Sequence, residues 1–153
     1  MNKNFLEIEN VTFTASAKNK VNNVSLQIEN KGDIVCLLGP SGIGKTTILR
    51  TIAGLEKIKT GKIILNGSVI SSKELHVEPE NRNISLAFQD NSLFPHYSVI
   101  QNIEFGAERN NKKKENLNMK EVINFLHLDH VINKYPHQIS SGEAQRASLA
   151  RSL

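Results

Sequence analysis

The first half of the chain consists of short apolar runs separated by turn residues, and this pattern predicts a β-rich region. Residues 5–14 alternate loosely between apolar and polar positions, and residues 24–28 alternate cleanly, so each segment suits a half-buried strand. The polar stretch 15–23 between them predicts a hairpin loop. Residues 34–38 are all apolar, which is typical of a strand buried on both faces of a parallel sheet.

A second hairpin is predicted at Asn66-Gly67, because this pair separates two apolar runs between residues 61 and 70. The polar stretch 71–83 indicates a connection, and residues 84–88 predict another short apolar strand.

Beyond residue 93 the apolar positions recur every three or four residues, and this period predicts helices. Ser98 suits the N-cap of a first helix that runs to Gly106, Asn118 suits the cap of a second, and a third begins near Ser140. The apolar positions expected on their buried faces are Val99, Ile100, Ile103 and Phe105, then Val122, Ile123, Phe125 and Leu126, and finally Ala144, Ala147 and Ala150.

A glycine-rich segment follows the apolar run 34–38 and precedes a helical pattern. The order of strand, glycine loop and helix gives a G-x-x-x-x-G-K-[ST] match the context of a phosphate-binding loop. The alternative, an ordinary turn with a surface lysine, leaves this full match unexplained. The candidate nucleotide-binding residues are Gly39, Pro40, Ser41, Gly42, Ile43, Gly44, Lys45, Thr46 and Thr47.

The residue types in this loop suit a triphosphate. The glycines have no Cβ, so backbone N–H groups can turn inward onto phosphate oxygens. A helix that begins near Lys45 adds its positive dipole end to the same place. Lys45 is expected to reach the β- and γ-phosphates, and the Thr46 hydroxyl is expected to bind Mg²⁺.

Composition and charge change this picture little. The chain has 153 residues, 39% of them apolar and 22% charged, which fits one globular domain. We see no apolar run long enough to span a bilayer and no secretory signal at the N-terminus. Cys36 is the single cysteine, within the run predicted to be buried, and a reduced cytoplasmic compartment is the simplest fit. The net charge of +4 is compatible with three kinds of anionic partner, namely nucleotides, nucleic acid and an anionic membrane face, and it does not distinguish between them.

Further stretches resemble one family in the correct order. Phe88-Gln89 resembles the glutamine loop of ABC transporter ATP-binding subunits, and Ser140–Arg146 resembles their signature segment. Residues 88–96 look like the importer branch that handles ferric iron, sulfate, polyamines or maltodextrins, with a lean toward ferric iron. The resemblance implies an α/β P-loop NTPase fold, with a mixed sheet, an antiparallel N-terminal β region and a helical subdomain.

The resemblance also implies how the chain is divided. Residues 1–153 are expected to form a partial nucleotide-binding domain, with a β-rich part that carries the phosphate loop at 1–93. A helical subdomain is expected at 94–141, and 142–153 are expected to begin the signature helix.

Roles at the site are carried over from the family. Gln89 is expected to contact Mg²⁺ or the attacking water, so Thr46 and Gln89 are the predicted metal ligands. The segment expected to face the nucleotide of an opposite protomer is Ser140, Ser141, Gly142 and Glu143. The implied cofactors are ATP and Mg²⁺, and the implied partners are membrane-spanning permease subunits and a second copy in a head-to-tail dimer. Neither a nucleic-acid partner nor direct membrane insertion is expected, and the expected location is cytoplasmic, peripheral on the inner face of the cell membrane.

The sequence departs from the family pattern at several positions. Ser141 stands where the family prefers glycine, and Glu143 stands where it prefers glutamine. Ala15 occupies the place of the adenine-stacking aromatic, and Phe13, on the same strand face, is the nearest ring.

The family also places an Asp-Glu pair at the end of an apolar strand after the signature helix. The sequence stops at Leu153 inside a helical pattern, so we expect an N-terminal portion without catalytic residues. Such a chain is expected to bind nucleotide weakly at best and not to hydrolyse it alone. Residues 34–38 would then have an unpaired strand edge.

Two other functions stay open at this point. One is a non-catalytic module that binds nucleotide or a partner. The other is a small P-loop kinase or GTPase that uses Asp90, at the end of the apolar segment 84–88, for Mg²⁺. The second leaves the signature segment unexplained. The five histidines have no regular metal-ligand spacing.

Overall fold

A computed structural model describes residues 4–14, 20–88, 93–109 and 118–153. The chain divides into two compact units, Met1–Ile84 and Ser85–Leu153. Within the described ranges, no helix is both long and apolar enough to cross a bilayer.

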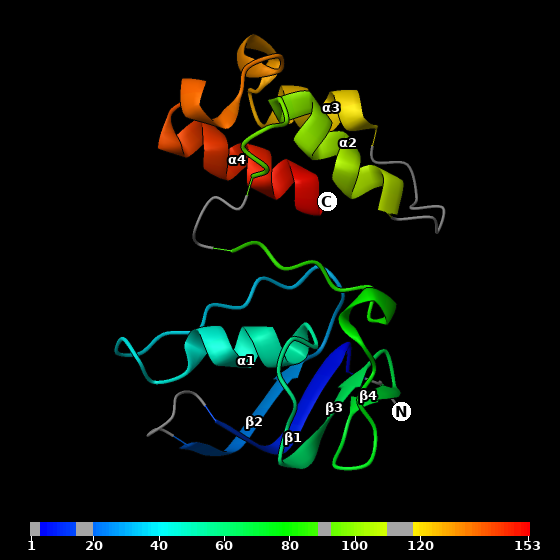
Figure 1. Cartoon of the computed structure of the whole chain (residues 1–153). Coiled ribbons are helices and arrows are strands. Elements are labelled where there is room, and N and C mark those ends of the chain that lie inside the picture. Colours follow the sequence, from blue (N-terminus) through cyan, green and yellow to red (C-terminus); the bar gives the residue numbers. More distant parts are fainter. Residues whose placement is uncertain (1–3, 15–19, 89–92, 110–117) are drawn as a thin grey trace. The chain divides into compact units, whose positions relative to one another are not determined.

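The first unit is a four-stranded antiparallel sheet with one helix packed on it (Figure 1). The strands β1 (Leu6–Thr14), β2 (Lys20–Ile28), β3 (Thr60–Leu65) and β4 (Ser68–Ser71) lie in the order β2-β1-β3-β4. The helix α1 (Lys45–Ile52) contacts β1. Apolar residues of the strands, of α1 and of the segment before β3 form the core, namely Leu6, Ile8, Val11, Phe13, Ile48, Ile58, Ile63 and Ile70.

Local turn chemistry accounts for the predicted hairpin between β3 and β4. Asn66 and Gly67 both have positive φ, 49° and 73°, as a two-residue hairpin turn of the type favoured by strand twist requires. Asparagine and glycine are the residues that adopt this conformation at least cost. The hairpin prediction is therefore confirmed.

The structure corrects three strand predictions. Residues 34–38 and 84–88 are not strands, and β2 begins at Lys20, inside the stretch predicted as a loop. Ile34 is 99% exposed and Leu38 is 87% exposed, and Cys36 is exposed as well. A strand needs a neighbouring strand for its backbone hydrogen bonds, and no segment among the described residues pairs with 34–38 or 84–88.

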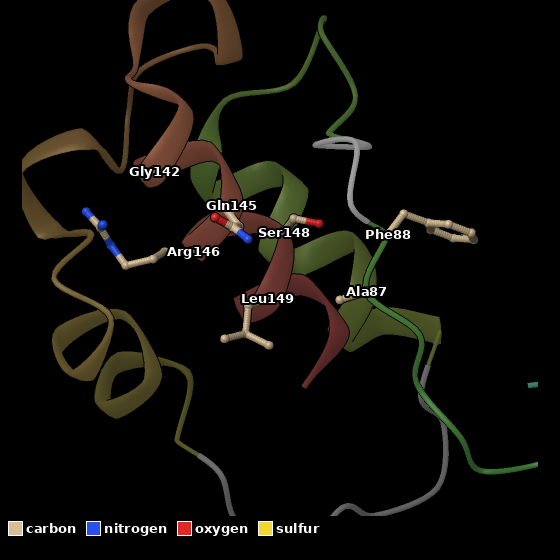
Figure 2. Close-up of a pocket in the computed structure, with 7 residues that line it drawn as sticks. All are labelled: Ala87, Phe88, Gly142, Gln145, Arg146, Ser148 and Leu149. Carbon is tan, nitrogen blue, oxygen red and sulfur yellow. The ribbon is translucent and has the colours of Figure 1, made fainter. Parts of the chain in front are cut away.

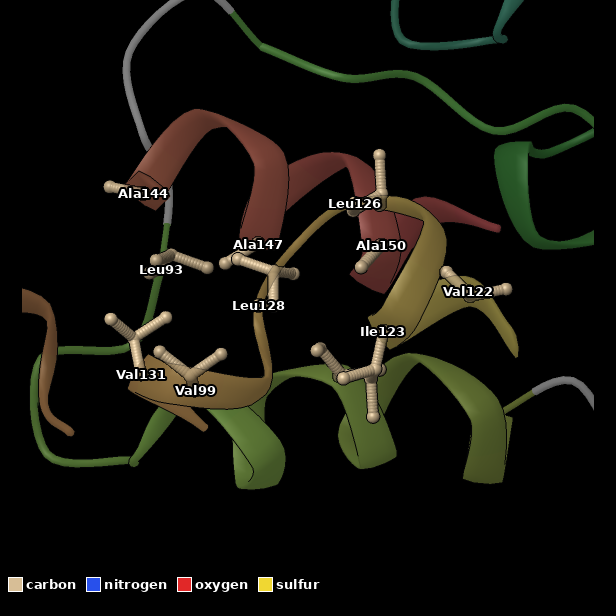
Figure 3. Packing of buried hydrophobic residues seen from close by; sticks show 11 residues of the cluster. Leu93, Val99, Val122, Ile123, Leu126, Leu128, Val131, Ala144, Ala147 and Ala150 are labelled. Atoms are coloured by element: carbon tan, nitrogen blue, oxygen red, sulfur yellow. The ribbon is translucent and has the colours of Figure 1, made fainter. Parts of the chain in front are cut away.

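The second unit is helical. It contains α2 (Val99–Arg109), α3 (Met119–Phe125) and α4 (Ser141–Ser152), and 3₁₀ turns at Asp129–Val131 and Pro136–Gln138. Figure 3 shows how the small side chains of α4 lie beside the larger residues of the cluster. The cluster consists of Leu93, Val99, Ile103, Val122, Ile123, Leu126, Leu128, Val131, Ala144, Ala147 and Ala150. A further 3₁₀ turn, Pro79–Asn81, lies in the first unit.

The helix starts in this unit follow the predicted caps. The Asn118 side chain accepts a hydrogen bond from the Lys120 N–H, and the Ser98 hydroxyl accepts one from the Gln101 N–H. One buried-face prediction is wrong, because Phe125 is 83% exposed. Val122, Ile123 and Leu126 share one helix face, and the residue before Leu126 turns away from it.

Candidate functional site

The phosphate loop leads directly into α1, as predicted. Gly44 is the N-cap of α1 with φ 106°, and no side chain in the described part of the chain caps the helix there. The first turn contains no acidic residue. The first N–H groups of a helix have no acceptor within the helix itself, so this helix start is open to an anion.

Glycine is required where the loop turns. Gly42 has φ 81° and Gly44 has φ 106°, a backbone region that residues with a Cβ rarely adopt. No atom of the described residues lies within 4 Å of the position that a Cβ would occupy at Gly42, so the constraint there is the backbone angle.

Lys45 folds back over the loop. Its Nζ donates hydrogen bonds of 2.7 Å to the Gly39 carbonyl and of 2.7 Å to the Pro40 carbonyl. An ammonium group has three N–H donors, so one is left for a phosphate oxygen. None of the salt bridges between described residues involves Lys45. The loop therefore holds a cation in place at the open helix start.

The two threonines after Lys45 differ in environment. Thr46 is exposed, and its hydroxyl is the kind of oxygen ligand that Mg²⁺ prefers. Thr47 is half-buried, and its carbonyl accepts a hydrogen bond of 2.7 Å from the buried Thr51 hydroxyl. Thr46 thus fits a metal ligand, and Thr47 belongs to the packing of α1.

The signature segment begins α4 and is capped by its own side chains. The Ser140 hydroxyl accepts a hydrogen bond from the Glu143 N–H at 3.3 Å, and Glu143 Oε2 accepts from the Ser140 N–H at 2.7 Å. Glu143 Oε2 also accepts from the Ser140 hydroxyl, and Glu143 Oε1 lies 2.7 Å from His130 Nε2. The hydrogen bonds from Ser140 and the contact with His130 lower the pKa of Glu143 to about 2. A carboxylate therefore occupies this helix start.

A groove of about 530 Å³ lies beside α4 in the second unit. Figure 2 shows Ala87 across from α4 and the Phe88 ring pointing away from the helix. Phe88 is 41% exposed, and the residues that line the groove are Ala87, Phe88, Gly142, Gln145, Arg146, Ser148 and Leu149. The described part of the predicted glutamine loop therefore lies next to the signature helix. Gln89, Asp90 and Ala15 lie outside the described residues.

Phe13 is only 1% exposed, in the core of the first unit. Its ring is occupied by packing against other apolar side chains, so the structure gives the adenine-stacking role no support. Among the residues that the structure describes, no group of three or more histidine, cysteine, aspartate or glutamate side chains could hold a metal ion.

Three residues with specific contacts were not predicted. Arg82 is buried at the C-terminal end of α1, His76 contacts it, and His130 contacts Glu143. None of these three contacts left a signal in the sequence. The spacing of Ser140 and Glu143 indicates a capping box, which places Glu143 at the start of α4 but does not predict its contact with His130.

An α/β fold that carries a glycine loop at the start of a helix defines the class of P-loop NTPases. The family model described as ABC transporter matches residues 21–153. The chain belongs to the ABC transporter family.

Several relatives are similar over almost the whole chain. The sulfate/thiosulfate import ATP-binding protein CysA of Pseudomonas syringae pv. tomato is 40% identical over an aligned region of 154 positions, which covers 97% of this chain and 46% of the relative. The putrescine transport ATP-binding protein PotG of Escherichia coli K12 is 41% identical, over 97% of this chain and 38% of the relative. The Fe(3+) ions import ATP-binding protein FbpC of Photorhabdus laumondii is 39% identical, over 99% of this chain and 42% of the relative. The chain spans less than half the length of these relatives.

Solved structures agree with this fold. The dimeric structure of MJ0796, a bacterial ABC transporter cassette, matches with a TM-score of 0.76 and 26% identity. The match covers 97% of this chain and 68% of that chain. The same cassette has been solved in a post-hydrolysis state bound to ADP and Pi.

Proposed function

We propose that this chain binds ATP, together with Mg²⁺, at residues 39–47, as part of the ATP-binding subunit of an importer. The observation that carries the proposal is the uncapped start of α1, with Lys45 Nζ fixed over the loop by the Gly39 and Pro40 carbonyls. A cation and unpaired backbone N–H groups at one helix start favour a phosphate group. The relatives named as ATP-binding proteins support the same ligand.

Each residue of the loop has a role in this proposal. The backbone amides around Gly42 and Gly44 surround the phosphates, and Lys45 directs its remaining N–H donor toward the β- and γ-phosphate oxygens. Thr46 supplies one oxygen ligand to Mg²⁺, which neutralises phosphate charge when it is bound. Gln89 is proposed as a second contact to the metal or to the attacking water.

The proposed partners follow from the relatives. Their names specify import or transport of sulfate or thiosulfate, putrescine and ferric ions at nearly equal identity, so the class proposed is solute import. Permease subunits in the membrane would be the direct partners, at the cytoplasmic face. The dimeric cassette MJ0796 supports a pair of copies. The arrangement proposed for that pair is head-to-tail, with Ser140, Ser141, Gly142 and Glu143 facing the nucleotide of the other copy.

The same comparisons bear on one of the other two functions, and a binding measurement bears on the second. The family match includes the signature segment, which a kinase or GTPase that uses Asp90 leaves unexplained. A non-catalytic partner-binding module predicts that nucleotide does not bind the loop at all. Nucleotide binding is therefore the measurement that decides.

The test replaces Lys45 by methionine and measures Mg-ATP binding by calorimetry. Loss of a charged hydrogen-bond donor is expected to weaken binding by about 10- to 100-fold. Lys57→Met is the matched control, because Lys57 is an exposed lysine in the same unit. It should leave the affinity within about twofold. Equal affinities for Lys45→Met and the unchanged chain would refute nucleotide binding at this loop.

A further inference from the structure

Arg82 is a buried cation with a complete set of hydrogen-bond acceptors. Its side chain is 2% exposed, and none of the salt bridges between described residues includes it. Every guanidinium nitrogen donates a hydrogen bond, and the five donors of an arginine match five acceptors. These acceptors are Val77 O (2.7 Å), Thr51 O (3.0 Å), Ile52 O (2.9 Å), Ser71 Oγ (2.8 Å) and His76 Nδ1 (3.2 Å).

Two of these acceptors belong to the end of the helix that carries the phosphate loop. Thr51 and Ile52 are the last residues of α1, and carbonyls there have no N–H partner within the helix. A cation at this end also complements the negative end of the helix dipole. Because α1 has only eight residues, its two ends are about 12 Å apart. A contact at one end therefore fixes the direction of the other.

The chain leaves room for the guanidinium at Gly54. Gly54 follows α1 with φ 89°, and a Cβ there would lie 2.5 Å from Arg82 Nε. Two separate constraints therefore require glycine at position 54: its positive φ angle, and the space that the Arg82 side chain fills.

His76 links the same cluster to the sheet. Because Arg82 can only donate, His76 Nδ1 accepts, and His76 Nε2 carries the proton that faces the Gly54 carbonyl at 3.1 Å. His76 is bridged to Ser71 at the end of β4, and the Val77 N–H bonds to the Ile70 carbonyl. Arg82 therefore joins the end of α1 to β4 and to the segment that follows it.

A buried cation without a carboxylate partner is costly, and burial lowers the pKa of the Arg82 guanidinium while the charge of Glu78 opposes this shift. An apolar side chain would fill the same space without that cost. What it could not do is hold two carbonyls of α1 and three other acceptors in one fixed plane.

We infer that Arg82 is a positioning residue for the nucleotide site: it fixes the orientation of α1, so that the loop amides and Lys45 point at the phosphates. This inference depends on the proposed function of the loop. Arg82 contacts no nucleotide in this role and acts through α1.

The test uses Arg82→Lys and Arg82→Ala, with Arg50→Met as the control. Arg50 is on α1 as well, but it is half-exposed and pairs with Glu56. Mg-ATP affinity is measured by calorimetry well below the melting temperature, and backbone hydrogen exchange is followed over residues 40–48. We expect Arg82→Lys to lose about tenfold in affinity, because an ammonium cannot reproduce the planar fork. Exchange at 40–48 should become faster, with β1 and β3 unchanged, and Arg50→Met should match the unchanged chain.

Chemical rescue separates positioning from general stability. Methylguanidine added to Arg82→Ala is expected to restore most of the lost affinity by filling the vacated site. If Arg82→Ala does not fold, Arg82→Lys decides alone. A folded Arg82→Lys with unchanged affinity and unchanged exchange at 40–48 overturns the inference, even if its melting temperature falls. If the unchanged chain does not bind Mg-ATP, the proposed function fails, and the exchange at 40–48 still reports whether Arg82 orders the loop.

Discussion

The helices α1 and α4 both begin at a segment predicted to face phosphate, and their starts are built in opposite ways. At α1 the cap is Gly44 in a left-handed conformation, with no side-chain cap and no acidic residue in the first turn. At α4 the cap is Ser140, and the Glu143 carboxylate bonds back to it. One helix start is left open for an external anion, and the other already holds an anion from its own chain.

The difference shows that the positive end of a helix dipole can serve either to bind a ligand or to stabilise the helix itself. A helix start attracts negative charge whether the charge comes from a ligand or from a side chain. At α1 nothing in the described chain competes with a phosphate, and Lys45 strengthens the attraction. At α4 the Ser140 hydroxyl donates to Glu143, so it has to change partner before it can contact a phosphate. The cap formed by Ser140 and Glu143 therefore stabilises α4, and its hydrogen bonds have to break before the helix start can bind a phosphate.

The largest expected effect comes from adding a methyl group at each helix start. Gly44→Ala forces a residue with a Cβ into φ 106° and is expected to cost about 1–2 kcal/mol of unfolding free energy. It should also weaken Mg-ATP binding, because the loop backbone has to shift. Urea unfolding followed by circular dichroism and an ATP titration measure the two effects.

Gly142→Ala is the matched change at α4. Gly142 has a helical backbone, and the nearest atom to an added Cβ is Arg146 Nη1 at 3.7 Å. Alanine there is expected to stabilise the helix by up to about 1 kcal/mol. The comparison fails if both substitutions shift unfolding in the same direction.

A smaller effect is expected from removing the side-chain cap that α4 has and α1 lacks. Ser140→Ala removes the acceptor for the Glu143 N–H, and loss of such a cap costs about 1 kcal/mol. Ser152→Ala, near the end of α4, is the control, since its hydroxyl bonds to the Leu149 carbonyl within its own turn. Urea midpoints for the two variants should differ, and equal midpoints would mean that the cap contributes nothing.

Much of the fold could be predicted where the determining residues are close together in the sequence. The turn at Asn66-Gly67, the loop before Lys45 and the cap at Asn118 each depend on a few adjacent residues. The strand predicted at 34–38 failed because its hydrogen-bond partners have to come from a distant segment. An apolar run favours burial, but it does not show which segment would bury it, and residues such as Ile34 and Leu38 stay exposed among the described residues.

The candidate site divides in the same way. The phosphate loop could be identified from a contiguous motif, and the roles of Gln89 and of the signature segment stay predictions. Arg82 could not be identified, because the Thr51 carbonyl that it caps is 31 positions away and the surrounding stretch is polar. The pairing of Ser140 with Glu143 could have been predicted from its spacing, although Glu143 was interpreted as a departure from a family pattern.

The smallest effect concerns acid, and it tests whether the α4 start holds a charge. The pKa of Glu143 is lowered to about 2 in the folded chain, from an ordinary value of 4.5, first by the side-chain and backbone hydrogen bonds from Ser140 and then by His130. Above pH 4.5 the carboxylate is ionised in both states and its stabilising contribution is complete. Between pH 4.5 and about 2 the unfolded chain takes up the proton first, so the contribution is lost progressively as the pH falls.

The unfolding free energy of the unchanged chain should therefore decline more steeply over this range than that of Glu143→Gln, which keeps a capping side chain without the charge. Glu104→Gln removes an exposed carboxyl from α2 and should follow the unchanged chain. If Glu143→Gln has the same acid slope as the unchanged chain, the carboxylate is not held at the α4 start, and the contrast with α1 then rests on the Ser140 hydroxyl cap alone.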